Sequence, residues 1–249
     1  MILSALVDTL LHLECGSMQL RKLILITMLS LTVLPVFASG ARKKQIDPGL
    51  VKLVEDIDKK GSEVQSMRAR FVQRKEISLL TEPVEMSGVF YMRKPDGIKF
   101  DFDPEDDLVL ILSKEEMVTM SPEAKKASRI KLKKRKTELT RGLLSEKLST
   151  LLGYFSMTRA SSDSGARLIL EPSRRKLRKK FKNVELWVNN EHLIHRVKIT
   201  LKDGDIYELA LTEIEENVEI KPNLFDTTIP DGYEMGERME SILGVDIEL

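Results

Sequence analysis

The stretch "GVFYMRKPDGIKFDFDP", residues 88–104, carries an alternation of side chains on which the interpretation of the whole fold depends. Large apolar residues alternate with polar ones on both sides of a Pro-Asp-Gly turn, so the pattern predicts two strands, each with one apolar face. The apolar positions are Phe90, Met92, Ile98, Phe100 and Phe102. Because such a face is costly to expose to water, we expect it to pack on the protein's own core or on a bound apolar molecule.

Alternation with a period of two continues through most of the chain. The segments that show it are 66–77, 84–94, 97–103, 107–113, 116–122, 128–134, 166–172, 181–190, 193–204 and 206–214. Short connections rich in Pro, Gly and Asp separate these segments, and a hairpin turn is expected at 202–205. Because connections this short join antiparallel neighbours, the sequence predicts a mainly β (α+β) protein with a long antiparallel sheet and few helices.

Two segments have the period of an amphipathic helix instead. The first begins with an N-cap residue, Asp47, and a proline, and its apolar positions are Leu50, Leu53, Val54 and Ile57. The second spans 138–155, and its apolar positions are Leu144, Leu148, Leu151 and Phe155. A long sheet has an open face and open edges, so we expect the two helices to cover it.

Residues 18–40 have the order of a secretory signal peptide. The basic residues Arg21 and Lys22 precede a short apolar core, a proline ends that core, and small residues follow at 38–40. The apolar core is too short to favour a membrane span. The segment therefore predicts export and cleavage.

Residues 1–17 carry no positive charge ahead of their apolar run, so we interpret them as an upstream extension with Met18 as the working start. Cys15 is the single cysteine of the chain, and Glu14 before it does not suit a lipidation motif, which needs a small residue there. We expect a single mature domain at 41–249, with its core at 47–235, in the periplasm. A mature chain without cysteine suits that oxidising compartment.

The overall composition describes a globular protein without a dominant charge. The chain has 249 residues, a net charge of +1 at pH 7, 42% hydrophobic and 32% charged residues. This balance gives no general attraction to nucleic acid. One cysteine also excludes an internal disulfide framework.

The sequence offers no complete catalytic or metal-binding constellation. His192 and His195 lie three apart beside Glu191, but residues three apart on a strand point to opposite faces. The sequence has no phosphate-binding glycine loop and no nucleophile elbow. The carboxylates of residues 101–107 are interpreted as solvated turn residues, with a glycosidase pair as the alternative. We therefore expect no enzyme activity, no metal and no cofactor.

Two strongly basic runs occur at 125–136 and 174–182. They are interpreted as solvated strand and loop faces. The alternative is a surface that meets anionic lipid headgroups or an acidic partner protein.

Several segments resemble a known family in their order and spacing. The segments "SMRARFVQ" (66–73), "SGVFYMRKP" (87–95) and "IKFDFDP" (98–104) resemble strands of the periplasmic outer-membrane lipoprotein carrier proteins, the LolA-like family. The later segments "VELWVNNEHLIHRVKI" (184–199) and "NLFDTTIPDGY" (223–233) are similar to the C-terminal half of the same family. The resemblance covers residues 47–235.

The resemblance implies an incomplete antiparallel β-barrel, or strongly curved sheet, in which helices lid an apolar cavity for lipoprotein acyl chains. It also implies a basic residue before the proline of the second segment that can hydrogen-bond the lid. Lys94 stands there in place of the usual Arg, and it lacks the planar fork that holds two carbonyls at once. The expected ligand-binding residues are Phe71, Phe90, Met92, Lys94, Ile98, Phe100, Phe102, Leu110, Leu144, Leu148 and Leu151. Ordinary core packing is the alternative for the apolar members of this set.

The function implied is that of a monomeric periplasmic chaperone that carries lipoproteins from the inner toward the outer membrane. Its partners would be lipid acyl chains, an inner-membrane releasing transporter and an outer-membrane acceptor, with no nucleic acid. Lys94 and the segment "LSKEEMVTM" (112–120), where the family usually has an Asp-Gly turn, leave another lipid, such as a glycolipid, open as cargo. The rival functions are an envelope-stress sensor of the same fold, which usually has a second domain, and a periplasmic hydrolase.

The signal-peptide interpretation predicts where the exported protein begins. Cleavage in the small-residue segment should give a mature chain that starts at Ser39 or Ala41. N-terminal sequencing of exported protein tests this. A mature chain that starts at Met1, or one lipidated at Cys15, would contradict the interpretation.

Overall fold

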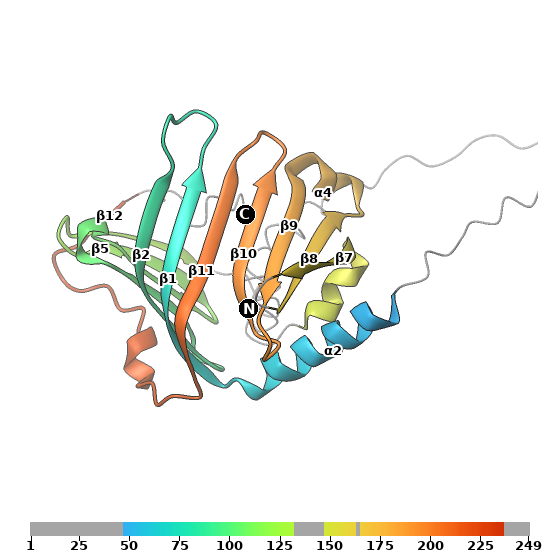
Figure 1. Cartoon of the computed structure of the whole chain (residues 1–249). Coiled ribbons are helices and arrows are strands. Elements are labelled where there is room, and N and C mark those ends of the chain that lie inside the picture. The colour runs from blue at the N-terminus through green and yellow to red at the C-terminus, as the bar shows by residue number, and fades with distance from the viewer. Residues whose placement is uncertain (1–46, 132–146, 163–164, 237–249) are drawn as a thin grey trace, which may run out of the picture.

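The computed structural model of the chain describes residues 47–131, 147–162 and 165–236 (Figure 1). Its strands form one twelve-stranded sheet in the order β12-β6-β5-β4-β3-β2-β1-β11-β10-β9-β8-β7. The strands are β1 (Ser66–Glu76), β2 (Val84–Arg93), β3 (Gly97–Phe102), β4 (Val109–Ser113), β5 (Glu116–Ser121), β6 (Lys126–Lys131), β7 (Phe155–Ser162), β8 (Gly165–Pro172), β9 (Phe181–Val188), β10 (Ile194–Leu201), β11 (Ile206–Glu216) and β12 (Glu234–Met235). The described helices are α2 (Pro48–Glu63), α4 (Arg175–Lys180) and the short 3-10 helices η2 (Pro104–Asp106), η3 (Leu148–Gly153) and η4 (Pro222–Phe225).

The mainly β fold expected from the alternation is confirmed. Each alternating segment contains a strand, and neighbouring strands pair antiparallel. The pair β12–β6 is parallel and departs from the expected pattern. Most of the other elements of the fold lie between these two strands in the sequence. No hairpin joins them, so no short turn dictates their relative direction. None of the described helices is long and apolar enough to cross a membrane.

The helix expected at 138–155 is wrong in its described part. Residues Leu148–Gly153 form a single 3-10 helix, η3, and Phe155 already begins β7. Phe155 and Met157 alternate with polar residues, and β7 pairs along its whole length with β8. That ladder outweighs the local helical spacing. Leu144 lies outside the described residues.

The basic segment 174–182 also differs from the strand or loop expected for it. It contains a short helix, α4, whose Leu177 is buried while the surrounding basic residues are exposed. One buried leucine in a polar sequence gives too weak a periodicity to predict a helix of six residues.

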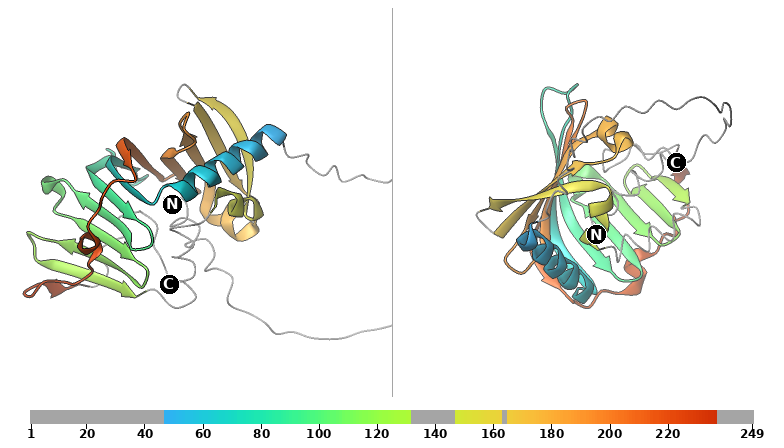
Figure 2. Two further views of the ribbon diagram at one scale, coloured as in Figure 1. Left: turned by 90° about the horizontal axis from the view of Figure 1, so that it is seen from below. Right: turned by 90° about the vertical axis from the view of Figure 1, so that its right-hand side faces the viewer.

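The sheet is open and strongly curved. Its edge strands β12 and β7 are not paired with each other, and β3 to β6 turn away behind β1 and β11 (Figures 1 and 2). This is the incomplete barrel, or strongly curved sheet, that the family resemblance implied. The curvature divides the sheet into an inner face and an outer face.

Helix α2 covers part of the inner face. Its N-cap Asp47 accepts a hydrogen bond from the backbone N–H of Gly49 at 3.0 Å, as the sequence predicted, and Pro48 occupies the first turn. Its four buried residues join one apolar cluster with residues of β7 to β11. These helix residues are Leu50, Leu53, Val54 and Ile57.

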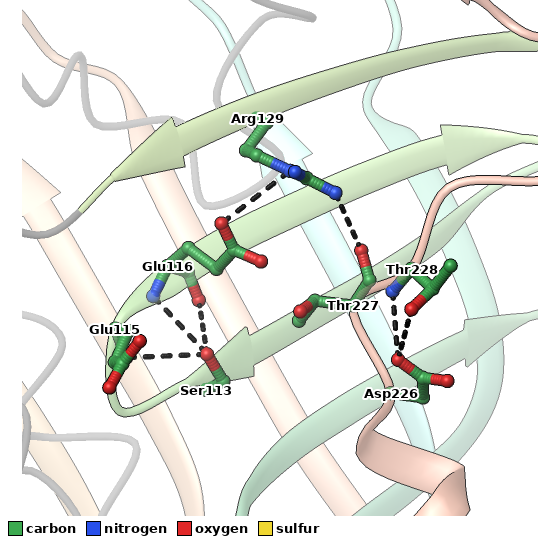
Figure 3. A network of polar contacts seen from close by, with 7 residues as sticks. All are labelled: Ser113, Glu115, Glu116, Arg129, Asp226, Thr227 and Thr228. Carbon is green, nitrogen blue, oxygen red and sulfur yellow. Dashed lines mark hydrogen bonds and ion pairs between the residues drawn. The ribbon is translucent and has the colours of Figure 1, made fainter.

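The outer face is covered on one side by the chain that follows β11. Helix η4 lies against β3 and β4, and polar contacts fasten the residues after it (Figure 3). The Arg129 guanidinium donates to the Thr227 carbonyl at 2.9 Å and pairs with Glu116 at 3.5 Å. Arg129 therefore ties β6 both to β5 and to the C-terminal segment.

The acidic turn at 101–107 is a structural element rather than the solvated surface expected for it. Arg70 binds Asp103 through two N–H···O bonds of 3.0 and 2.8 Å, and Ser87 donates to the same carboxylate. Asp107, with φ of 44°, accepts the Ser121 hydroxyl and the backbone N–H of Glu123. Hydrogen bonds from Arg70 and then from Ser87 lower the pKa of Asp103.

Replacement of Asp103 by Asn should cost about 1 kcal/mol of unfolding free energy at pH 7, because the pair is partly exposed. A carboxylate whose pKa is lowered by folding stabilises the protein above its ordinary pKa and loses that contribution as the pH falls. The difference between wild type and Asp103→Asn should therefore shrink below about pH 4. Urea unfolding at several pH values measures it, with Asp231→Asn, an exposed position, as the control. A difference that is independent of pH would contradict the assignment.

Candidate functional site

One apolar band runs across the inner face of the sheet. Residues that lie directly opposite each other on paired strands share a face. The register aligns Leu168, Leu186, Val197 and Leu209 across β8, β9, β10 and β11. On the other side of β1 it aligns Ala69, Phe90, Phe100 and Leu110 across β1, β2, β3 and β4. Leu211, two residues after Leu209 on β11, is opposite Phe71 of β1, so the two rows lie on the same face.

The band has two halves that differ in what packs on them. The half on β7 to β10 includes the four buried side chains of α2 and, from η3, Leu148 and Leu151. The other half, which we call the aromatic half, lies on β1 to β4 and β11. Among the described residues, its members all come from strands and turns, and none comes from a helix. They are Val64, Met67, Ala69, Phe71, Phe90, Met92, Ile98, Phe100, Phe102, Leu110, Leu193, Leu209 and Leu211.

Four phenylalanines form the centre of the aromatic half. Phe71 lies edge-to-face against Phe100 and Phe102, with ring centroids 5.2 and 5.0 Å apart, and Phe90 lies against Phe100 at 5.1 Å. Each such pair adds about 0.5–1.5 kcal/mol to the burial of its area. Gly88 makes room for this arrangement, because an added Cβ would lie 2.8 Å from Cε1 of Phe71.

The band becomes polar toward β5 and β6. Beyond Leu110, the same row continues through Thr119 of β5 and Ser128 of β6, which are both buried. Any long apolar molecule on the inner face would therefore find hydroxyl groups at this end.

Lys94 contacts the C-terminal end of α2. Its Nζ donates to the carbonyl oxygen of Gly61, in the last turn of the helix, where carbonyls lack helical partners. Burial lowers the pKa of the Lys94 ammonium. The nearby ion pair between Lys60 and Glu216, at 2.7 Å, joins the same end of α2 to β11. Since this end continues directly into β1, Lys94 holds the attached end of the helix and not its free end.

The structure brings most of the expected ligand-binding residues together. Seven lie in the aromatic half, namely Phe71, Phe90, Met92, Ile98, Phe100, Phe102 and Leu110. Leu148 and Leu151 lie in the other half under α2, Lys94 lies at the end of α2, and Leu144 is outside the described residues. Whether these residues bind a ligand stays a prediction.

The inner-face residues of β9 to β11 were missed as members of the site. Their alternation identifies them as strands, but alternation does not reveal which strands share a face. The pairing of β11 with β1, distant in sequence, places Leu209 and Leu211 beside Phe71.

The histidines belong to a turn and the strand after it. His192 has φ of 63° in the turn before β10, where the Asn189 side chain accepts backbone N–H groups of Glu191 and Leu193. Burial lowers the pKa of His195. Within the described ranges, no three His, Cys, Asp or Glu side chains are grouped so that they could hold a metal ion.

Residues 62–228 match the model of the family described as outer membrane lipoprotein carrier protein LolA. The chain belongs to the LolA family. No curated protein matches the sequence. The membership is therefore carried by the family model, which spans the aromatic half and most of the sheet.

Several solved structures are similar to this LolA-family chain. An uncharacterized conserved protein from Thermus thermophilus has a TM-score of 0.48 at 9% identity, covering 76% of this chain and 99% of its own. A LolA superfamily protein from Nitrosomonas europaea has a TM-score of 0.38 at 13% identity, with coverages of 71% and 96%. The Mycobacterium tuberculosis lipoprotein LppX has a TM-score of 0.45 at 14% identity, with coverages of 70% and 100%.

Replacement of Lys94 by Ala should loosen the last turn of α2 without releasing the whole helix. The change removes the bond to Gly61 but leaves the apolar contacts of Leu50 and Leu53, so unfolding should cost about 1 kcal/mol less. Hydrogen exchange should speed up at residues 60–65 and stay unchanged at 50–57. Lys94→Arg, which keeps a donor, should restore slow exchange, and Lys52→Ala on the exposed side of α2 is the control. Faster exchange along all of α2 would contradict this assignment.

Proposed function

We propose that this LolA-family protein is a non-enzymatic periplasmic carrier that shields the acyl chains of lipoproteins on the aromatic half of its inner face. The observation that carries the proposal is the unbroken apolar band, half of which packs under α2 while the aromatic half receives no side chain from any described helix. The family model that spans residues 62–228 supports the same function. Helix α2 covers the neighbouring half of the band and acts as a lid by moving away, which would add that half to the apolar surface available to cargo.

The energy of hydration explains why such a face is needed. Each methylene exposed to water costs about 0.8 kcal/mol, so a lipoprotein with three acyl chains and roughly forty methylenes would cost on the order of 30 kcal/mol to hold in water. No set of hydrogen bonds replaces that term, because acyl chains have no polar groups. A continuous apolar surface of protein is the only match for it.

The phenylalanine cluster fits the role of a face that opens and closes. In the closed protein the rings of Phe71, Phe90 and Phe100 bury one another. Cargo that enters would replace ring contacts by contacts with methylenes, so the apolar area removed from water is conserved. The flexible side chains of Met67 and Met92 in the same cluster adapt to chains of variable length.

In this function the protein crosses the periplasm with its cargo. It receives lipoprotein from an inner-membrane releasing transporter and passes it to an acceptor at the outer membrane. Residues 18–40 direct its export, and the carrier works as a monomer because the apolar band is used for cargo and not for a second copy.

A charge placed in the aromatic half tests the proposal. Phe100→Glu puts a carboxylate where acyl chains should lie, and a buried unpaired carboxylate would cost several kcal/mol or become protonated. On a face that opens to water the carboxylate stays hydrated, so the variant should remain folded. Its affinity for a fluorescent fatty-acid probe should fall at least tenfold.

The matched control is Val118→Glu, at a fully buried position on the outer face. It should unfold or lose far more thermal stability than Phe100→Glu. Phe100→Glu that binds the probe like wild type would contradict the proposal, and so would a variant that unfolds as completely as Val118→Glu. Mass spectrometry of lipids that co-purify with the exported protein then identifies whether the cargo is lipoprotein or another lipid.

A further inference from the structure

The described structure has a second surface of unusual composition, at one end of the sheet. Seven of the nine residues 174–182 are Arg or Lys. In α4 the apolar Leu177 is buried, and so is Phe181 directly after it, so the basic side chains project outward. Within the described part of the chain, no ion pair holds Arg175, Arg178 or Lys179.

The tip of the β1–β2 hairpin exposes large apolar side chains. Leu79 is 92% exposed and Leu80 is 50% exposed, and Val84 beside them is 40% exposed. The connection after β1 is short, and the backbone N–H of Leu80 bonds the carbonyl of Ile77 at 2.8 Å. Two adjacent leucines held out on a hairpin tip are costly to keep in water, which indicates that they have a partner.

The basic helix and the apolar tip lie at the same end of the sheet. Glu76, the last residue of β1, pairs with Ile206 at the start of β11, and Leu201 at the end of β10 pairs with Phe181 at the start of β9. Figure 1 shows the β1–β2 hairpin, the β10–β11 turn and α4 together at the upper end of the sheet, and the side view in Figure 2 agrees.

Hydrogen bonds connect these parts into one rim. The carboxylate of Asp205, in the β10–β11 turn, accepts the backbone N–H and the hydroxyl of Ser78, each at 2.8 Å. The backbone N–H of Lys202 in the same turn donates to the carbonyl of Lys180 at 2.9 Å. The rim is thus a fixed surface that is cationic at α4 and apolar at the hairpin.

We propose that this rim docks on the surface of an anionic lipid bilayer. The leucines of the hairpin tip enter the headgroup region while the cations of α4 meet lipid phosphates. The combination of exposed apolar residues and flanking positive charge is what interfacial binding requires.

An acidic protein is a less suitable occupant for this rim. A protein interface depends on aromatic or apolar anchors that fill pockets of the partner, surrounded by a polar rim. Around α4 the apolar side chains point inward, so that part of the surface offers charge alone. The acidic residues Glu76 and Glu82 lie on the hairpin side, so the positive charge is concentrated at α4 and does not surround the leucines.

Docking on a bilayer goes beyond the proposed function and does not depend on its cargo. The rim lies at the opposite end of β1 from the contact between Lys94 and the last turn of α2. A protein docked in this way holds the attached end of α2 away from the membrane. The lid is therefore free to move while the carrier is at the bilayer.

Sedimentation of the purified chain with vesicles tests the proposal. Wild type should bind vesicles that contain about 30% phosphatidylglycerol, bind pure phosphatidylcholine vesicles at least tenfold more weakly, and lose binding as salt rises. The variant Arg175→Gln/Arg178→Gln/Lys179→Gln removes three charges. Each basic residue near an anionic surface strengthens binding to that surface about fivefold. The binding of the triple variant to phosphatidylglycerol vesicles should therefore fall on the order of a hundredfold.

The control is Lys125→Gln/Lys126→Gln/Lys131→Gln, which removes the same charge from exposed positions of the other basic run. It should bind vesicles within about threefold of wild type, and both triple variants should bind the fatty-acid probe normally. A loss of probe binding alone would therefore count against the proposed function and not against docking.

The apolar tip is tested separately with Leu79→Trp, corrected for the fluorescence of Trp187. Its emission should shift to shorter wavelength on phosphatidylglycerol vesicles and be quenched by brominated lipid. Equal binding to both kinds of vesicle, equal losses in the two triple variants, or no shift at position 79 would each overturn the proposal. Binding to an acidic protein without binding to vesicles would overturn it too.

Discussion

The structure depends on one constraint, which is that one face of the twelve-stranded sheet is apolar over β1 to β4 and β7 to β11 and cannot remain in water. A flat sheet of this size would need a second layer as large as itself. Curvature reduces the demand, because it brings the two halves of the inner face toward each other. One helix of sixteen residues and one short 3-10 helix then cover the half on β7 to β10.

The outer face of β7 to β10 is in contact with water, and it carries charged side chains. The Arg196 guanidinium lies 4.5 Å from the ring of Trp187, and Arg167 approaches the same ring at 6.0 Å. Both arginines also pair with glutamates of neighbouring strands, Glu208 and Glu185. Cross-strand pairs of this kind align the strands while keeping this part of the outer face polar.

Most of the fold could be predicted because its signals are local. The period of two at Phe90–Met92 and Ile98–Phe102, the Asp47-Pro48 cap and the glycine turn at 202–205 each act within a few residues. The failures have a common physical cause. Leu148, Leu151 and Phe155 have helical spacing, yet the ladder between β7 and β8 forms only when a distant partner is present. Asp103 looks like a solvated residue in the sequence because its partner, Arg70, is thirty-three residues away.

Local sequence signals predicted one part of the candidate site, the apolar residues of β1 to β4. They did not predict the part that β11 contributes. The strands β1 to β4 follow one another in sequence, so their alternation placed Phe71, Phe90 and Phe100 on one face. Leu209 and Leu211 join that face only through the pairing of β11 with β1, which closes a loop of more than a hundred residues. A local sequence pattern cannot predict a pairing between strands that are this far apart in the sequence.

The polar contacts of α2 with the described sheet are concentrated at one end of the helix, and this determines how the helix can move. Gly61 accepts from Lys94, Lys60 pairs with Glu216, and the backbone of Gln65 donates to Asn217, whereas the first turns of α2 are held by apolar side chains alone. Apolar contacts have no fixed direction and can slide, but hydrogen bonds cannot. The helix can therefore rotate about its C-terminal end, residues 60–65, where hydrogen bonds and an ion pair fix it to the sheet. At about 1.5 Å per residue, the part of the helix from residue 62 back to residue 48 is about 21 Å long, so a rotation of about 28° lifts the far end by about 10 Å, the spacing of two packed layers.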